Sequence, residues 1–312
     1  MNAKTLIVSL LLLLTFQSCI TKEENVVVVG LLNGPSSIGM VQAIENQTYL
    51  DGVKIQYHIK DNPQHLRALL QSGNMDMAIL PMTMAYSMID NNIDIKIFAI
   101  TGWGNLFVLS RDSLVDFSQI TNGIISVPGE GQTPDLVTKF LIEYLGLQNK
   151  VSLNYTYPSP LLLTSALAMD KVSYAVLPEP LASLALSKDS SIFRTINIAD
   201  LWHKSLPSIP LVQSVFVVKN SFYQDNKEWF NTFADSLEKS ALEVIANPNA
   251  ALTLAIEKEL LPPLGFDTSV ITNSHLDFVR NEQMADTITR YLDTFYTLDD
   301  SFDIQEYIIK KP

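Results

Sequence analysis

The chain has 312 residues and a formal net charge of -12, and 47% of its residues are apolar. Binding to nucleic acid requires clustered Lys and Arg, but these residues are scattered singly, so nucleic acid is excluded as a partner. The length predicts two domains, because one domain usually holds about 100 to 200 residues. An acidic surface is typical of a soluble protein outside the cytoplasm.

The first residues have the pattern of a bacterial export signal. Lys4 precedes an apolar run from Leu6 to Leu14. This run is far shorter than the roughly 20 apolar residues that span a bilayer, so it indicates a cleaved signal peptide at 1–19.

The end of this signal resembles a lipobox, in which the cysteine is acylated and becomes the new N-terminus. Ser18 directly precedes Cys19, the only cysteine of the chain, although Phe16 stands where a lipobox carries an aliphatic residue. We expect lipidation at Cys19, a tether at 20–25 and a mature protein anchored on the outer side of a bacterial membrane. The alternative is a secreted protein whose Cys19 is removed with the signal peptide. In either case the mature chain forms no internal disulfide.

Short apolar strands alternate with helical patterns in the next part of the chain, which favours parallel α/β units. The continuous β-branched run Val26–Leu32 predicts a strand that is buried on both faces. The turn NGPSS follows it. The further elements expected here are strands at Val53–Ile59 and Met77–Leu80, a helix that ends at Gly73, and two strand-like stretches within Ile95–Ser110.

A second βα series begins near residue 123. We expect a strand at Gly123–Val127 and, after the loop PGEGQ, a helix with Thr133 as N-cap and Pro134 in its first turn. The other elements of this series are strands at Val151–Tyr157 and Tyr174–Leu177, a helix at Leu161–Met169 and a helix after Pro180.

The run Leu211–Lys219 predicts a long strand, with no helix of matching length before it. We interpret it as a return crossing that, together with Phe107–Ser110, connects two lobes. Lobe 1 is then 26–110 plus 210–312, and lobe 2 is an insertion at 111–209. The rest of lobe 1 is predicted to be helical, with a long amphipathic helix over Trp229–Val244 and two more helices after Asn249 and Asn281.

The order and spacing of several motifs resemble one known family. VVVVGLLNGPSSIG, ALLQSGNMDMAIL, ISVPGEGQTPD and YAVLPEPLAS are followed by the crossing strand and by a long helix that ends near NPNAA. The succession resembles the substrate-binding proteins of nitrate, sulfonate, taurine and thiamine-precursor ABC transporters, over nearly the whole mature chain. The resemblance implies the α/β type II periplasmic-binding fold, in which two doubly wound lobes joined by two crossover segments close on a small molecule. It also implies an ABC permease with its ATPase as partners, a monomer, and no cofactor or metal.

The resemblance places ligand contacts in loops at the carboxyl ends of strands and at helix starts, where free N–H groups face the cleft. Carried over by position, the expected ligand-binding residues are Asn33, Gly34, Ser36, Ser37, Met82, Thr83, Trp103, Gly129, Gln132, Thr133 and Glu179. Structural alternatives remain open for some of them: Ser36 as a helix cap, Thr83 as an N-cap and Trp103 as a packing anchor.

None of these loops contains Lys or Arg, and Glu130 and Glu179 place carboxylates near the cleft. This favours a neutral or cationic heterocycle, such as a thiamine-type pyrimidine, because dianions are usually paired with guanidinium groups. A sulfonate, taurine or nitrate remains the alternative, since helix N-termini can hold a monoanion without a basic side chain.

Catalytic motifs are absent from the sequence. The four histidines stand far apart, and there is no HExxH, GxSxG or GxxxxGK pattern. Two enzyme classes share the implied fold: thiamine-pyrimidine synthases, whose cysteine-rich motif is missing, and a menaquinone-pathway dehydratase, which belongs in the cytoplasm. We therefore expect a binding protein and not an enzyme. A sensor lobe that presents its ligand to a membrane receptor remains open.

Overall fold

The computed structural model describes residues 25–114, 116–120, 123–298 and 302–311. The predicted signal peptide, Cys19 and the tether up to residue 24 lie outside the described residues. Within the described ranges, none of the helices combines the length and the apolar character needed to cross a bilayer.

The first lobe is built on a six-stranded sheet with the order β2-β3-β1-β4-β11-β5. β1 pairs in parallel with β3 and β4, whereas β11 runs antiparallel to β4 and β5. The strands are β1 (Val26–Leu32), β2 (Tyr49–Leu50), β3 (Val53–Lys60), β4 (Met77–Pro81), β5 (Ile95–Trp103) and β11 (Val212–Lys219).

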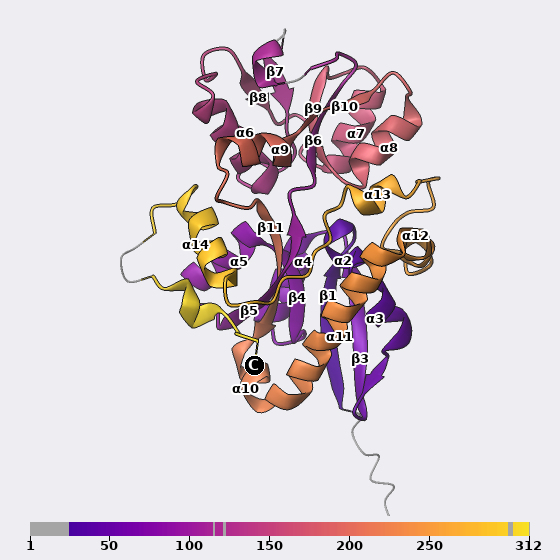
Figure 1. Cartoon of the computed structure of the whole chain (residues 1–312), viewed down its shortest axis with the longest axis vertical. Helices are drawn as coiled ribbons and strands as arrows, with labels where there is room; N and C mark the ends of the chain where they lie inside the picture. The colour runs from indigo at the N-terminus through magenta and orange to yellow at the C-terminus, as the bar shows by residue number, and fades with distance from the viewer. Residues whose placement is uncertain (1–24, 115, 121–122, 299–301, 312) are drawn as a thin grey trace, which may run out of the picture.

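Helices cover both faces of this sheet (Figure 1). They are α2 (Pro35–Ile38), α3 (Val41–Asn46), α4 (Pro63–Gln71), α5 (Met82–Asp90), α10 (Asn220–Asp225), α11 (Lys227–Ala246), α12 (Pro248–Glu257), α13 (Ser269–Thr272) and α14 (Met284–Asp293). β4 shows why a strand that is buried on both faces has a continuous apolar sequence. Its Met77 and Ile79 belong to the core formed with α3, α11 and α12. The alternate residues, Ala78 and Leu80, belong to the core formed with α4, α5 and α14.

The second lobe holds a five-stranded sheet with the order β10-β6-β9-β7-β8. β7 pairs in parallel with β8 and β9, and β6 runs antiparallel to β9 and β10. Its strands are β6 (Leu106–Ser110), β7 (Ile124–Ser126), β8 (Ser152–Asn154), β9 (Tyr174–Pro178) and β10 (Phe193–Asn197), and its helices are α6 (Thr133–Tyr144), α7 (Pro160–Ala168), α8 (Leu181–Lys188) and α9 (Ile198–Ser205).

The chain passes between the sheets twice. It leaves the first sheet at Trp103, enters the second at Leu106, and returns between the end of α9 and the start of β11. The segment Phe107–Ser110, which the sequence pattern places in lobe 1, pairs within the second sheet. We propose lobe boundaries at 104–105 and 206–211 in place of those at 110 and 209.

Two local expectations need correction. β10 and α9 precede the return strand, where the sequence pattern indicated no helix of matching length. The Asn197 side chain caps α9 by accepting from the backbone N–H of Ala199 at 2.9 Å. Thr133 is the first residue of α6 and not its N-cap, a position that Gln132 occupies without a side-chain cap bond.

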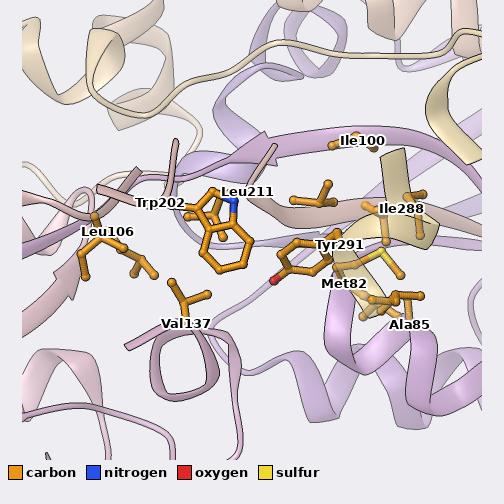
Figure 2. Close-up of a cluster of buried hydrophobic side chains, with 14 of the residues drawn as sticks. Met82, Ala85, Ile100, Leu106, Val137, Trp202, Leu211, Ile288 and Tyr291 are labelled. Carbon is orange, nitrogen blue, oxygen red and sulfur yellow. The ribbon is translucent and has the colours of Figure 1, made fainter. Parts of the chain in front are cut away.

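Apolar side chains of both lobes meet beside the return crossing (Figure 2). Trp202 of α9 is 1% exposed and stacks on Phe295, with ring centroids 5.7 Å apart. Tyr291 of α14 lies 6.1 Å from the same tryptophan ring. Because one continuous core includes these residues together with Val137 and Leu211, the lobes pack against each other on this side.

Candidate functional site

A cavity of about 1390 Å³ lies between the lobes and is lined by residues of both. In the first lobe the lining includes the loop that follows β1 and the start of α5, which follows β4. In the second lobe it includes residues 131–134, at the start of α6, and residues 178–181, between β9 and α8. Carboxyl ends of strands from two sheets thus converge on one space, which is the usual position of a ligand site in open α/β sheets.

Seven of the residues expected to contact a ligand line this cavity. They are Asn33, Gly34, Ser36, Thr83, Gln132, Thr133 and Glu179. Gly34 also marks a close approach of the lobes, because a Cβ built on it would lie 3.9 Å from Pro180 Cδ. Its φ of 124° is one that L side chains rarely adopt.

The other four expected residues lie away from the lining. Ser37 and Met82 are 0% exposed, and Met82 is part of the apolar core. Gly129 instead joins its loop to the loop before α7, since its N–H donates to the Pro158 carbonyl at 3.1 Å. Trp103 lines a smaller pocket against α11, and its Nε1 donates to the Asp277 carbonyl at 2.8 Å, as expected of a packing anchor.

Two threonine hydroxyls meet across the cavity. Thr83 Oγ1 and Thr133 Oγ1 are 3.4 Å apart, and both residues are buried. Neither acts as an N-cap, because Pro81 and Gln132 occupy those positions. Ser36 likewise lies inside α2, whose N-cap is Gly34, and makes no cap bond.

Glu179 does not offer a free carboxylate to the cavity. Its side chain is fully buried, and Oε1 lies 2.5 Å from Arg194 Nη2. Oε2 accepts from the Ser183 N–H at 3.1 Å. This ion pair neutralises the charge that the sequence suggested and holds the loop between β9 and α8 in place. Glu130 is exposed and does not line the cavity.

Charged side chains lie toward the outside of the cavity. Asp61, Asp90 and Glu259 are exposed, and Arg67 of α4 is half-buried. The loops indeed contain no Lys or Arg, but a helix contributes one guanidinium that the loop pattern could not reveal.

Two tyrosine rings that the sequence did not predict at the site form an aromatic wall of the cavity. Tyr86 and Tyr296 line the cavity with ring centroids 4.6 Å apart. Burial raises the pKa of both phenols; Asp90 raises that of Tyr86 further, and Tyr86 adds to the rise for Tyr296. Both rings therefore stay neutral and form an apolar wall, with their planes inclined by 38° to each other.

A buried carboxylate supports the loop before α6. Asp135 is 0% exposed and accepts from the N–H of Gly131 at 2.7 Å and from Tyr155 OH at 2.7 Å. Lys139 Nζ lies 2.8 Å from the same carboxylate, and this hydrogen bond is the main reason that the pKa of Lys139 is raised. Gly131 lines the cavity, so Asp135 fixes part of the wall without touching the space itself.

The described residues contain no cluster of three or more His, Cys, Asp or Glu side chains that could hold a metal ion.

A scan against protein-family models finds no match, and a search of curated proteins finds none either. Solved structures do match. An ABC transporter from Parabacteroides distasonis is 25% identical with a TM-score of 0.75, over 87% of this chain and 92% of that one. The periplasmic aliphatic sulphonate binding protein SsuA from Escherichia coli has a TM-score of 0.71 at 14% identity, over 91% and 97% of the two chains.

The periplasmic nitrate-binding protein NrtA from Synechocystis PCC 6803 is 11% identical with a TM-score of 0.68, over 92% of this chain and 86% of that one. The structural neighbours named here are thus an ABC transporter and two periplasmic binding proteins for sulphonate and nitrate, which confirms the resemblance seen in the sequence. The chain has the two-lobed α/β fold of periplasmic binding proteins, as predicted.

Proposed function

We propose that this chain is an extracytoplasmic solute-binding lipoprotein, which captures a small molecule between its lobes and delivers it to an ABC importer. The observation that carries the proposal is the convergence of strand ends and helix starts from both lobes on one cavity. The structural neighbours named above support the same class. Lipidation at Cys19 rests on the lipobox-like sequence alone.

Hinge closure is the proposed mechanism. The two crossings are tied together, since Gly104 N–H donates to the Leu211 carbonyl at 3.1 Å and Asn105 N–H donates to Gln213 Oε1 at 2.9 Å. Rotation about this pair of segments would open the cavity, and a ligand that contacts both lobes would favour the closed form. The permease would then recognise the closed lobes. The chain performs no covalent chemistry in this account.

For the ligand we propose a neutral or cationic heterocycle, such as a thiamine-type pyrimidine. The Tyr86–Tyr296 wall supports a planar ring, and Asp90, whose charge acts on Tyr86, favours a positive charge near it. The cavity volume of about 1390 Å³ also leaves room for a ligand much larger than nitrate.

A sulfonate, taurine or nitrate is the second candidate. Arg67 at the lining and the N-termini of α5 and α6 favour it, because guanidinium groups and helix starts both bind anions. Two structural neighbours bind an aliphatic sulphonate and nitrate.

Calorimetry with hydroxymethylpyrimidine, taurine and nitrate distinguishes the two ligand classes, and X-ray scattering with and without the bound compound tests closure. Saturable binding of the pyrimidine with a decrease in the radius of gyration supports the proposal. Binding of taurine or nitrate alone would transfer the assignment to the second class. A radius that stays unchanged at ligand saturation would contradict hinge closure.

A further inference from the structure

Asn105 lies on the first crossing, between β5 and β6, and lines the cavity while being only 5% exposed. Its backbone is held on both sides. The N–H donates to Gln213 Oε1 at 2.9 Å, and the carbonyl accepts from the Glu179 N–H at 3.1 Å. The side chain is therefore not needed to position the crossing.

The carboxamide of Asn105 is unusual for a buried polar group. Its Oδ1 is buried without a hydrogen-bond partner among the described residues. An asparagine side chain carries two donors and an acceptor with two lone pairs, and buried groups of this kind are nearly always bonded. Leaving such a group unpaired opposes folding, so its presence at a cavity wall requires a reason.

Uncharged polar side chains of β11 lie next to Asn105. Gln213 and Ser214 at the start of β11 line the cavity, and Gln213 Oε1 accepts from the Asn105 N–H. Ser214 shows how a polar group here is satisfied within the protein, since its Oγ lies 3.3 Å from Thr101 Oγ1. The Glu179 backbone N–H donates to the Asn105 carbonyl, and the Glu179 carboxylate is paired with Arg194. The part of the cavity at the crossings thus offers hydrogen bonds without a net charge.

We infer that the Asn105 carboxamide is a specificity-determining contact, which hydrogen-bonds an uncharged polar group of the ligand such as an amide, a carbonyl or a ring nitrogen with its neighbouring amino group. This inference rests on the proposed function and deepens it. A site built to hydrogen-bond a ligand rejects analogues that lack the matching group, because the protein atom then stays buried and unpaired. Its place on the crossing also couples ligand contact to the segment about which the lobes rotate.

Three variants test the inference. Asn105→Leu removes the amide at nearly constant size, Asn105→Ala removes it and leaves space, and Asn249→Ala changes an exposed asparagine outside the lining as a matched control. Each is compared with the unchanged protein by thermal unfolding without ligand and by calorimetry with hydroxymethylpyrimidine and taurine.

We expect Asn105→Leu to melt about 2–4 °C higher than the unchanged protein, because it removes an unpaired polar group. Both Asn105 variants should bind the recognised compound about 10- to 100-fold more weakly. The alanine variant shows that the loss does not come from steric blocking. Asn249→Ala should change neither quantity.

A lower melting temperature for Asn105→Leu would assign the side chain a structural role and overturn the inference, independently of the affinities measured for the two compounds. Unchanged affinity in both Asn105 variants would overturn it as well, while leaving the proposed function intact. If none of the compounds binds the unchanged protein, the proposed ligand classes fail, and the melting comparison still decides the role of Asn105.

Discussion

Thr83 Oγ1 and Thr133 Oγ1 lie 3.4 Å apart although they belong to different lobes. Each follows the carboxyl end of a strand and stands in the first turn of a helix, α5 in one lobe and α6 in the other. Both residues are buried, so the two helix starts face each other across a closed gap. This contact can exist only when the lobes are together, and it therefore reports on closure.

Removing these hydroxyls should weaken ligand binding more than folding. In a double-mutant cycle with Thr83→Val and Thr133→Val, we expect a coupling of about 0.5–1.5 kcal/mol in ligand affinity. Isothermal titration of each variant measures it. Thr138→Val is the matched control, because Thr138 is also buried on α6 but bonds the Pro134 carbonyl of its own helix at 2.6 Å. Additive effects of the two cavity substitutions would show that the pair does not form in the bound state.

We expect the Glu179–Arg194 pair to contribute to the stability of the fold and not to the preference of the cavity for a charged ligand. Arg194→Met leaves a carboxylate that is fully buried without its cation, so we expect a loss of about 3–5 kcal/mol in the free energy of unfolding. Adding Glu179→Gln should recover part of that loss. Denaturant unfolding of the single and double variants measures both effects. A single variant as stable as the unchanged protein would mean that water reaches Glu179.

Much of the first lobe could be predicted because its signals are local. The β-branched run Val26–Leu32 corresponds to β1 residue for residue. β10 was missed because Phe193–Asn197 is an edge strand whose polar residues interrupt the apolar pattern. Without β10, the partner of Glu179 fifteen residues further along the chain was not visible, and its carboxylate was interpreted as free.

The site residues also divide into those with a local sequence signal and those that only tertiary packing brings to the cavity. Glycine, proline and hydroxyl residues in the sequence predict the loops that follow strands. Seven of the expected ligand contacts in these loops line the cavity. Arg67, Tyr86 and Tyr296 lie on helices or in the C-terminal segment, and they reach the cavity only through tertiary packing. Asn105 stands between two strand-like stretches that the sequence predicts, but burial decides its role, and burial has no signature in a single sequence.

Close packing at the crossing predicts that Gly104→Ala is harmful. A Cβ at this position would lie 2.6 Å from Leu211 Cδ2 and 2.8 Å from Ala199 Cβ on α9, so the Leu211 side chain must move and α9 or the crossing must shift. We expect a loss of about 1–3 kcal/mol in stability and a changed radius of gyration in the ligand-bound form. Gly39→Ala serves as the control, since its Cβ would meet its nearest atom at 3.6 Å. Equal stability of both variants would show that the crossing is looser than these distances indicate.

Lipidation at Cys19 predicts that the protein follows the membrane fraction and incorporates labelled fatty acid when expressed in a bacterial host. Cys19→Ala should abolish the label and release the protein, while ligand affinity stays unchanged because the cavity lies among residues far along the chain. Fractionation and mass spectrometry of the mature N-terminus check both points. A mature chain that begins after residue 19 would favour the secreted form that the Phe16 departure leaves open.

The Asp189 carboxylate provides a test at low pH. Hydrogen bonds from the Ser191 side chain and backbone, followed by that from Arg111, lower its pKa from 3.8 to about 2. A carboxyl group whose pKa is lowered by folding stabilises the native state above its unfolded pKa, and this contribution disappears as the pH falls through the folded value. The contribution should thus be complete above pH 3.8 and be lost toward pH 2. Ser191→Ala should raise the midpoint of Asp189 in a carboxyl NMR titration and shift the loss of stability to higher pH. An unchanged midpoint in that variant would assign the lowered pKa to the backbone N–H of residue 191 and to Arg111.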